Sequence, residues 1–347
     1  MSMLATEPDA SASVIAQIVR AAAGGDLSAA EMRLTVNAIM DGAVTPAQAA
    51  ALLVALAVKG ETADEVVGAA WAMRDHAVAV TPRRGAIDVC GTGGDASGTF
   101  NISTAVAFVV AGAGVPVAKH GNRAMSSRCG SADVLEALGV RIDLAPQRSA
   151  QILEEHGIAF MFAQVHHPAM RHVAPVRREI GMKTLFNLLG PLTNPAAVRR
   201  QVVGVAHAGA QDIVASAIGR LGSERAAVIR GCDGLDEATL AGTTRVLEWN
   251  GSDLIEYEIV PEDAGLGRAT TEALAGGDAD ANAHMIGDVL AGASGPRRDV
   301  VLLNAALALL IAGAASDLRH GRSLAQRSIE TGAARDKLEV LRRESRR

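Results

Sequence analysis

The first residues whose types and spacing suggest chemistry lie in a glycine-rich segment, residues 88–104. The segment is Asp-Val-Cys-Gly-Thr-Gly-Gly-Asp-Ala-Ser-Gly-Thr-Phe-Asn-Ile-Ser-Thr, between a short apolar run and an alanine- and valine-rich stretch. Glycines let the backbone approach a ligand closely, and free N–H groups where a helix begins attract anions. Side chains that can donate hydrogen bonds follow at Thr99, Asn101, Ser103 and Thr104. The pattern predicts a phosphate-binding loop, with an ordinary structural turn as the alternative.

Two common nucleotide-binding motifs do not account for this loop. Gly91-x-Gly93-x-x-Ala96 matches a loose dinucleotide fingerprint. That fingerprint needs an acidic residue about twenty positions later to hold a ribose, and no Asp or Glu stands between Asp95 and Asp133. The Gly-x-x-x-x-Gly-Lys-Ser/Thr pattern of a P-loop is also absent from the sequence. We therefore expect a phosphate site of another class.

A second polar segment, residues 119–131, follows the apolar run 115–118. It contains Lys119, Arg123 and Arg128 among hydroxyl and amide side chains. The carboxyl ends of neighbouring strands in an open parallel sheet line one crevice, so the two polar segments are expected to face one ligand. Cations and hydroxyls suit a polyphosphate. A solvated basic loop is the alternative interpretation.

A third segment, residues 166–178, is rich in histidine and arginine and contains no acidic residue. Four of the nine histidines fall between residues 156 and 172. Zinc is a poor hypothesis because no nearby Cys, Asp or Glu completes a ligand set. Arg177 is a candidate for binding a substrate carboxylate, since a guanidinium presents a planar fork of donors. For each histidine, an ordinary structural role is an equal alternative.

A fourth segment, Asp233-Gly-Leu-Asp-Glu237, follows the apolar run 226–229. Adjacent carboxylates on a loop suit Mg²⁺, which prefers oxygen ligands and usually bridges to substrate phosphates. The same five residues also fit a turn followed by a helix start. A neighbouring polyphosphate site favours the metal, because a pyrophosphate needs its charge neutralised.

Residues 1–80 are predicted to form a small helical domain. Apolar residues recur there at helical spacing, and no strand pattern precedes residue 86. Three helix starts are indicated by capping patterns: Ser28 with Glu31, Thr45 with Pro46 and Gln48, and Thr62 with Glu65.

Residues 81–347 are predicted to form a larger α/β domain with a mostly parallel central sheet. Short apolar runs without polar alternation suit strands that are buried on both faces, and they alternate with helical stretches. These runs are 87–90, 115–118, 159–162, 201–205 and 226–229. Segment 168–190 is helical in pattern and is expected to pack on the N-terminal helices. The charged end, residues 342–347, is expected to be a frayed, solvated helix terminus.

Composition narrows the class of protein. The chain has 347 residues, of which 49% are hydrophobic and 20% charged, so a disordered or coiled-coil chain is excluded. A net charge of −5 argues against a nucleic-acid partner. Three cysteines without a Cys-x-x-Cys pair fit a reducing compartment. The apolar runs 105–118 and 300–315 are interrupted and too short to span a membrane, and no signal-peptide pattern is visible. We expect a cytoplasmic protein with no membrane partner.

Several motifs in the same order together resemble the anthranilate phosphoribosyltransferase family. They are the Gly91–Asp95 loop, the Asn101–Thr104 run, Lys119–Arg123, Gly190-Pro-Leu-Thr-Asn-Pro195 and Asp233–Glu237. The resemblance covers the chain to about residue 330. It implies a nucleoside phosphorylase/phosphoribosyltransferase-like fold and a homodimer joined through the helical domain. The implied reaction transfers a phosphoribosyl group from 5-phosphoribosyl 1-pyrophosphate to the amine of anthranilate, in tryptophan biosynthesis.

The resemblance also assigns roles to residues of this sequence. Those implied to bind phosphoribosyl pyrophosphate are Gly91, Gly94, Asp95, Thr99, Asn101, Ile102, Ser103, Thr104, Lys119, His120, Gly121, Asn122, Arg123, Ala124, Met125, Ser126, Ser127 and Ser131. Those implied to bind anthranilate or line its path are Gly91, His120, Asn122, His167, Arg177 and Pro191. One or two Mg²⁺ ions are implied at Ser103, Asp236 and Glu237. No acid or base is expected to be essential, and Lys119 is expected to help electrostatically.

The sequence departs from the family pattern at Lys183, Arg230 and Cys232, none of which belongs to the implied site. Two alternatives remain. A pyrimidine nucleoside phosphorylase shares the architecture but needs a single phosphate and a nucleobase pocket, against which Asp236 and Glu237 argue. A non-catalytic relative that binds phosphoribosyl ligands or nucleic acid is disfavoured by the acidic net charge. Association with a glutamine amidotransferase partner is left open.

Overall fold

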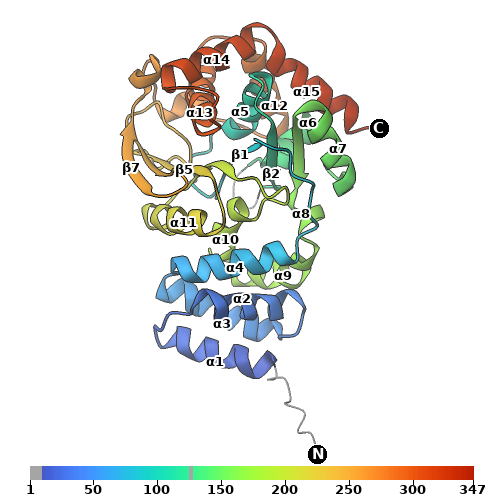
Figure 1. Ribbon diagram of the computed structural model, residues 1–347, viewed down its shortest axis with the longest axis vertical. Coiled ribbons are helices and arrows are strands. Elements are labelled where there is room, and N and C mark those ends of the chain that lie inside the picture. The colour runs from blue at the N-terminus through green and yellow to red at the C-terminus, as the bar shows by residue number, and fades with distance from the viewer. Residues whose placement is uncertain (1–9, 125–127) are drawn as a thin grey trace, which may run out of the picture. The chain divides into compact units, whose positions relative to one another are not determined.

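The computed structural model describes residues 10–124 and 128–347, which form two compact units. The first, called the helical unit, contains the chain up to Ala77 and the later segment His167–Thr193. The second, called the sheet unit, contains Val78–His166 and Asn194–Arg347. Figure 1 labels the helices of both units and strands β1, β2, β5 and β7 of the sheet unit.

The helical unit has no strand among its described residues. Its helices are α1 (Ala10–Ala22), α2 (Ala29–Met40), α3 (Pro46–Lys59), α4 (Ala63–Asp75), α9 (Ala174–Ile180) and α10 (Phe186–Leu189), with two 3₁₀ turns at Pro168–His172 and Gly190–Thr193. The three predicted helix starts are confirmed. Ser28, Thr45 and Thr62 each accept the N–H of the residue three positions later, whose side chain accepts the N–H of the cap in return.

A buried carboxylate holds the first turn of α4 to its neighbours. Glu65 is fully buried. It accepts the N–H of Leu27 at 3.0 Å, the N–H of Thr62 at 2.8 Å and the ammonium of Lys59 at 3.2 Å. Because every one of these partners stabilises the ionised form, the carboxylate can be buried without an uncompensated charge.

The returning segment packs on the N-terminal helices within this unit. Helix α9 contacts α3, and α10 contacts α4. Arg74 of α4 donates its Nε–H to the carbonyl of Leu192 at 2.8 Å. On the same helix, Trp71 lies under the guanidinium of Arg33, 5.9 Å from the ring centroid.

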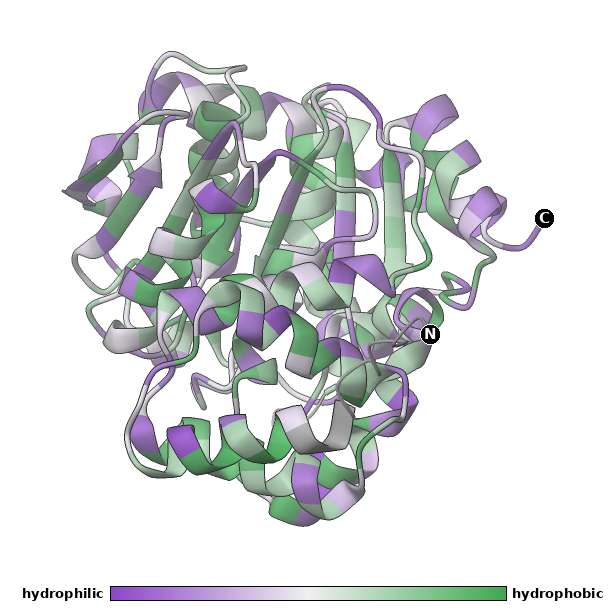
Figure 2. Ribbon diagram, turned by 60° about the horizontal axis from the view of Figure 1, so that its bottom comes forward, coloured by the Kyte–Doolittle hydropathy of each residue, from purple (hydrophilic) through white to green (hydrophobic). Residues whose placement is uncertain are grey.

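The sheet unit is built on seven strands in the order β3-β2-β1-β4-β5-β6-β7. The first five strands in this order are parallel: β3 (Ile158–Phe162), β2 (Val117–Gly121), β1 (Ile87–Gly91), β4 (Arg200–Gly204) and β5 (Arg225–Gly231). These are the five predicted strands, shifted by at most a few residues. The predicted fold class, a helical part and an α/β part with a mostly parallel sheet, is confirmed. Figure 2 shows hydrophobic stretches along the strands.

Two antiparallel strands, β6 (Thr244–Trp249) and β7 (Leu254–Ile259), were not predicted. Strand β7 alternates apolar and polar residues from Ile255 to Ile259, whereas β6 does not, and the two are joined by a turn containing Asn250-Gly251, with Gly251 at φ +104°. That dipeptide between two extended runs is a hairpin signal. Trp249 ends β6 and donates its indole N–H to the carbonyl of Ser223 at 3.0 Å.

Nine helices of the sheet unit, among the described residues, surround these strands. They are α5 (Ile102–Gly112), α6 (Ser131–Ala137), α7 (Pro146–His156), α8 (Ala163–His166), α11 (Ala208–Arg220), α12 (Ala279–Leu290), α13 (Pro296–Ile311), α14 (Leu318–Glu330) and α15 (Ala333–Glu344), with short 3₁₀ turns at Pro261–Ala264 and Thr271–Leu274. In the described ranges, none of the helices has the length and apolar character needed to cross a membrane.

The two longest apolar runs of the sequence are the core helices α5 and α13. Both are buried over most of their length and contact each other, and α5 lies on β1 while α13 lies on β4. The close approach of α5 and α13 to the neighbouring helix α14 depends on glycine. A Cβ on Gly112 would stand 2.3 Å from Ser328 Oγ, and one on Gly321 would stand 2.6 Å from the carbonyl oxygen of Ala306.

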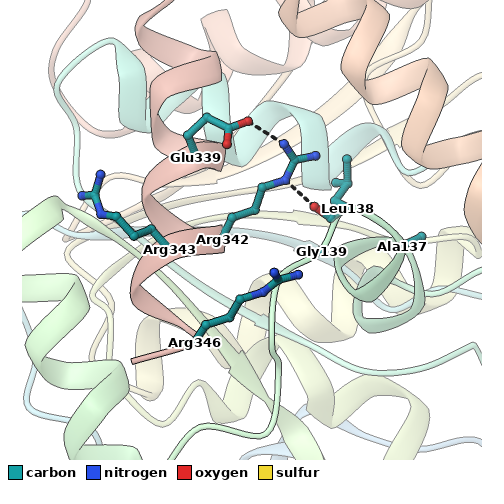
Figure 3. A pocket seen from close by; sticks show the side chains of 7 residues that line it. All are labelled: Ala137, Leu138, Gly139, Glu339, Arg342, Arg343 and Arg346. Atoms are coloured by element: carbon teal, nitrogen blue, oxygen red, sulfur yellow. Dashed lines mark hydrogen bonds and ion pairs between the residues drawn. The ribbon is translucent and has the colours of Figure 1, made fainter.

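The prediction of a frayed C-terminus is wrong. Glu344 and Ser345 are buried, at 3% and 2% exposure. Ser345 Oγ accepts the N–H of Arg141 at 2.9 Å, and Glu344 pairs with Arg148 at 2.9 Å. In Figure 3, Arg342 reaches from α15 to the carbonyl of Leu138 at the end of α6. Ion pairs and hydrogen bonds to distant segments hold a helix end that the charge pattern suggested would be free.

Candidate active site

Three of the predicted polar segments follow neighbouring strands of the sheet unit. Strands β1, β2, β4 and β5 end at Gly91, Gly121, Gly204 and Gly231. Because these strands are parallel neighbours, their carboxyl ends lie at one edge of the sheet. The glycine loop, the described residues 119–124 and 128–131, and the Asp233–Glu237 segment therefore meet at this edge, as the sequence predicted.

The acidic segment packs directly on the glycine loop. The N–H of Gly93 donates to Asp236 Oδ2 at 3.1 Å. A Cβ on Gly91 would stand 2.5 Å from the same oxygen, and one on Gly204 would stand 1.6 Å from the backbone oxygen of Asp236. Glycine is thus required at the ends of β1 and β4 to admit Asp236.

The glycine loop itself is wound through backbone conformations that favour glycine. Gly93, Gly94 and Gly98 have φ values of +67°, +77° and +66°, and Ala96 shares this region at +58°. Asp95 Oδ1 accepts the N–H of Ser97 at 3.3 Å. Turns with such positive φ values are the kind from which backbone N–H groups form anion-binding concavities, although the N–H groups of Gly93 and Ser97 already bind Asp236 and Asp95.

The carboxyl groups at this edge carry raised pKa values. Burial, and then the charge of Asp95, raises the pKa of Asp236 to about 7. Burial, and then the charge of Asp236, raises the pKa of Glu237 to about 8, although Lys119 acts in the opposite direction. The three carboxyl groups repel one another when ionised, so a divalent cation would relieve them.

A magnesium ion fits this donor set in part. Within residues 10–124 and 128–347, no three His, Cys, Asp or Glu side chains are arranged to hold a metal by themselves. Mg²⁺ usually takes one or two carboxylates and completes its shell with water and substrate phosphates. Asp236, Glu237 and the nearby hydroxyl of Ser103 suit that manner of binding.

Helix α5 begins at the centre of the site. Its N-cap Asn101 makes no side-chain cap; instead its amide donates to the carbonyl of Cys129 at 3.1 Å and accepts from Asn282 at 2.9 Å. The backbone N–H of Ser103 donates to Glu237, so a carboxylate faces the positive end of the helix dipole.

The other predicted phosphate-binding residues of α5 and the glycine loop differ in how accessible their side chains are to a ligand. Ile102 is buried in the core at 2% exposure, which leaves its backbone as the part that can meet a ligand. The hydroxyl of Thr104 is buried and has no hydrogen-bond partner among the described residues. Thr99 is partly exposed, with its hydroxyl 3.3 Å from Ser97 Oγ.

Lys119 lies beneath the site, buried on β2. Its ammonium donates to the carbonyl of Val89 at 2.6 Å and to Ser103 Oγ at 3.3 Å. It also acts electrostatically on buried Asp88, whose pKa burial raises and the lysine lowers. Asp88 accepts from the amide of Asn194 at 2.7 Å. The positive charge of Lys119 therefore acts on the interior of the sheet as well as on the site at its edge.

The segment after β2 is held by α6. Arg123 pairs with Asp133 at 2.9 Å and also with Glu136, and its guanidinium lies over the ring of Phe162 at 5.5 Å. The hydroxyl of Ser131 donates to the carbonyl of Asn122 at 3.3 Å. The predicted positions Met125, Ser126 and Ser127 lie outside the described residues.

The six residues predicted to bind anthranilate or line its path come from both units. The helical unit contains His167, Arg177 and Pro191, and the sheet unit contains Gly91, His120 and Asn122. Arg177 donates to Asn187 Oδ1 at 3.3 Å and lies over the ring of Phe186 at 5.7 Å. Burial lowers its pKa from the ordinary arginine value.

Sequence reasoning missed two residues that support the site. Asn194 donates to Asp88 and, at 2.8 Å, to the carbonyl of Ala118, so it ties β1 to β2. Its position in the Gly190–Pro195 motif was noted, but not its contact. Asp133 was noted only as the end of an acid-free stretch, yet it accepts three hydrogen bonds from the segment after β2.

Comparison with known proteins agrees with this arrangement. Residues 83–335 match a family model described as "Glycosyl transferase family, a/b domain", and residues 14–77 match its "helical bundle domain". Anthranilate phosphoribosyltransferases of Rubrobacter xylanophilus and Moorella thermoacetica are 54% and 53% identical to this chain, covering 94% of it and 96% of their own lengths.

Solved structures agree as well. The crystal structure of the Thermus thermophilus anthranilate phosphoribosyltransferase has a TM-score of 0.90 and 45% identity, over 95% of this chain and 99% of that one. The Saccharomyces cerevisiae enzyme, solved in complex with PRPP and Mg, has a TM-score of 0.89 and 25% identity over 96% and 98%. By its sequence, its fold and the residues gathered at the carboxyl edge of its sheet, the chain belongs to the anthranilate phosphoribosyltransferase family.

Proposed function

We propose that the chain transfers the phosphoribosyl group of 5-phosphoribosyl 1-pyrophosphate to the amine of anthranilate. The products are N-(5-phosphoribosyl)anthranilate and pyrophosphate, and the step belongs to tryptophan biosynthesis. The observation that carries this proposal is the meeting of the glycine loop, the Lys119 segment and the Asp236–Glu237 pair at one edge of the sheet. The proposal is supported by the two near relatives described above, which are both named anthranilate phosphoribosyltransferase.

Phosphoribosyl pyrophosphate is proposed to lie along the glycine loop, the start of α5 and the segment after β2. Backbone N–H groups of the loop and the hydroxyls of Thr99 and Ser103 would hold its phosphates. Displacement at the ribose C1 requires the departing pyrophosphate to be stabilised where its charge develops. Fixed donors suit this purpose because they need no reorganisation during the reaction.

Magnesium is proposed to bind at Ser103, Asp236 and Glu237. When bound, it supplies positive charge to the oxygens of the pyrophosphate. The yeast relative solved with PRPP and Mg supports this assignment. Asp236 and Glu237 must be ionised to take part, so the ion and protons compete for them.

The acceptor is proposed to bind through its carboxylate to Arg177, with Asn122, Gly91, His120, His167 and Pro191 around it. An aromatic amine is neutral near pH 7 and needs to be positioned more than deprotonated. Holding two reactants in line can contribute up to about 7–11 kcal/mol in ideal systems. No side chain is therefore assigned as an essential acid or base, and Lys119 acts by its charge.

The molecule is proposed to be a cytoplasmic homodimer joined through its helical part. Apolar side chains stand exposed on three neighbouring helices of that unit, with Val19 of α1 at 64%, Leu34 of α2 at 68% and Val58 of α3 at 78%. Such a group of exposed apolar side chains supports an interface. The proposed domains are residues 1–80 with 168–190, and the rest of 81–347.

The proposed reaction is tested by following the fluorescence of anthranilate after phosphoribosyl pyrophosphate and Mg²⁺ are added, with and without a chelator. We expect a rapid loss of fluorescence that the chelator abolishes. Arg177→Ala should raise the KM for anthranilate more than it lowers kcat, because the lost contact is to the acceptor's carboxylate. No loss of fluorescence at high enzyme concentration would contradict the transferase function.

A further inference from the structure

A single carboxylate, that of Asp133 in the first turn of α6, holds both ends of the segment that follows β2. Its Oδ2 accepts the N–H of Ala124 at 3.0 Å and the N–H of Gly130 at 2.9 Å. Its Oδ1 accepts from the guanidinium of Arg123 at 2.9 Å. Ala124 and Gly130 lie on either side of residues 125–127, so the carboxylate joins the chain entering this segment to the chain leaving it.

The same closure is visible in the packing of the backbone. A Cβ on Gly130 would stand 2.3 Å from the nitrogen of Ala124 and 2.7 Å from the carbonyl oxygen of Asn122. A Cβ on Gly121 would stand 2.2 Å from Ser131 Oγ. The two arms of the loop touch, and only glycine fits where they do. The close approach is therefore a built feature, independent of the hydrogen bonds to Asp133.

Further contacts distinguish Asp133 from its neighbour Glu136. The carbonyl of Asn122 accepts the N–H of Ala132 at 3.1 Å, which closes the loop on the side away from the carboxylate. Glu136 also binds the guanidinium of Arg123, at 2.9 Å through Nη2, but it contacts no backbone amide of residues 122–124 or 128–130. Among these described residues, Asp133 is the one of the two that binds both the side chain and the backbone.

Asp133 is held in the ionised form. Burial acts to raise its pKa, but the hydrogen bonds from Ala124 and Gly130 and the charge of Arg123 outweigh burial and lower the pKa below the ordinary value. An ionised acceptor makes stronger hydrogen bonds than a neutral one.

We propose that Asp133 is a positioning residue for phosphoribosyl pyrophosphate. It fixes the spacing of the loop ends, so that Asn122 and Arg123 stand ready for the ligand before it binds. This inference rests on the function proposed above for the same loop. Binding to loop ends that are already fixed avoids the cost of fixing them. Replacing Asp133 should therefore weaken the binding of phosphoribosyl pyrophosphate more than the binding of anthranilate.

Three variants separate the contributions. Asp133→Ala removes all three hydrogen bonds and should raise the KM for phosphoribosyl pyrophosphate about 10- to 100-fold, as expected for bonds to a charged acceptor. Asp133→Asn keeps an oxygen for the two amides but loses the charge and turns an NH2 group toward Arg123, so it should recover only part of that loss. Glu136→Gln is the matched control and should stay within about threefold of the wild type. The KM for anthranilate should change by less than about threefold in all of them.

Two measurements make the outcome decisive. Hydrogen exchange should show slow amides at Ala124 and Gly130 in the wild type and Asp133→Asn, and fast ones in Asp133→Ala, at a temperature where all are folded. Titration calorimetry with phosphoribosyl pyrophosphate and Mg²⁺ should show the same order of affinities.

The inference is overturned if Asp133→Ala leaves the donor KM unchanged, or raises both KM values equally, while the wild type is active. If the wild type neither turns over nor binds phosphoribosyl pyrophosphate, the proposed function has failed and this inference fails with it. Altered amide exchange without altered donor affinity would reduce Asp133 to a purely structural residue.

Discussion

At the scale of single residues, Asp236 and Glu237 couple the fold to pH. Burial and neighbouring charge raise their pKa values to about 7 and about 8, above the ordinary 3.8 and 4.5. Between the ordinary and the raised values the folded chain binds protons that the unfolded chain does not. The free energy of unfolding contributed by these groups therefore falls as pH rises, until both are ionised above about pH 8.

The fall of stability with rising pH leads to a prediction for the metal-free protein. Its Tm should fall between pH 5 and pH 8.5, and the double variant Asp236→Asn, Glu237→Gln should show a flatter profile and little activity. Added Mg²⁺ should raise the wild-type Tm more at pH 8.5 than at pH 6, because fewer protons must leave. Differential scanning fluorimetry with and without Mg²⁺ measures this. Equal stabilisation by Mg²⁺ at both pH values would contradict it.

Lys119 has two separable roles. It is buried beside Asp88, and it donates to Ser103 at the site. Lys119→Met should cost about 3 kcal/mol of stability, because it removes the buried cation whose charge favours the ionised form of buried Asp88. The double variant Asp88→Asn, Lys119→Met should regain stability in urea denaturation but not kcat. Recovery of turnover in the double variant would show that the ammonium has no role in the reaction.

The residues of the site differ in how far sequence predicts them. The glycines of the loop, Lys119 and Asp236 could be predicted as site residues from the sequence. Their residue types and spacing match what the binding of phosphate and of a divalent cation requires. The contacts of Asp88 with Asn194 and of Asp133 with Gly130 could not. A polar side chain that bonds to backbone is chosen by geometry, and many sequences satisfy that geometry.

At the scale of elements, burial on both faces made the parallel strands predictable. Their apolar runs are continuous, whereas β6 and β7 mix polar and apolar residues and were missed although Asn250-Gly251 marks their hairpin. Strand β2 was placed two residues early because Val115 and Pro116 extend the apolar run. The end of α15 was misjudged because two of its residues bind distant segments: Arg342 donates to the carbonyl of Leu138, and Glu344 pairs with Arg148 of α7.

Helix packing in the sheet unit gives a matched pair of glycines. Gly321 of α14 has no room for a side chain, whereas a Cβ on Gly287 of α12 would meet nothing within 4 Å. Gly321→Ala should lower the free energy of unfolding by about 1–3 kcal/mol through overpacking. Gly287→Ala should raise it by about 0.5–1 kcal/mol, because alanine favours the helix. Chemical denaturation measures both, and a loss of stability in Gly287→Ala would contradict the packing argument.

At the scale of the whole molecule, the proposed homodimer has a direct test. Changing Leu34 and Val58 to Glu together should halve the mass seen by light scattering, since charges would be buried in the interface. Ile255 on β7, at 45% exposure, is an exposed apolar residue of the other unit, and Ile255→Glu should leave the mass unchanged. A wild-type chain that is already monomeric would refute the proposal.

The scarcity of aromatic residues has an optical consequence. The chain has two tryptophans, and each unit contains one: Trp71 on α4 and Trp249 on β6. Replacing either by Phe leaves a single tryptophan, and selective excitation of that tryptophan reports on one unit alone. Unfolding followed in the two single-tryptophan proteins would then show whether the units melt together or in sequence, without any added label.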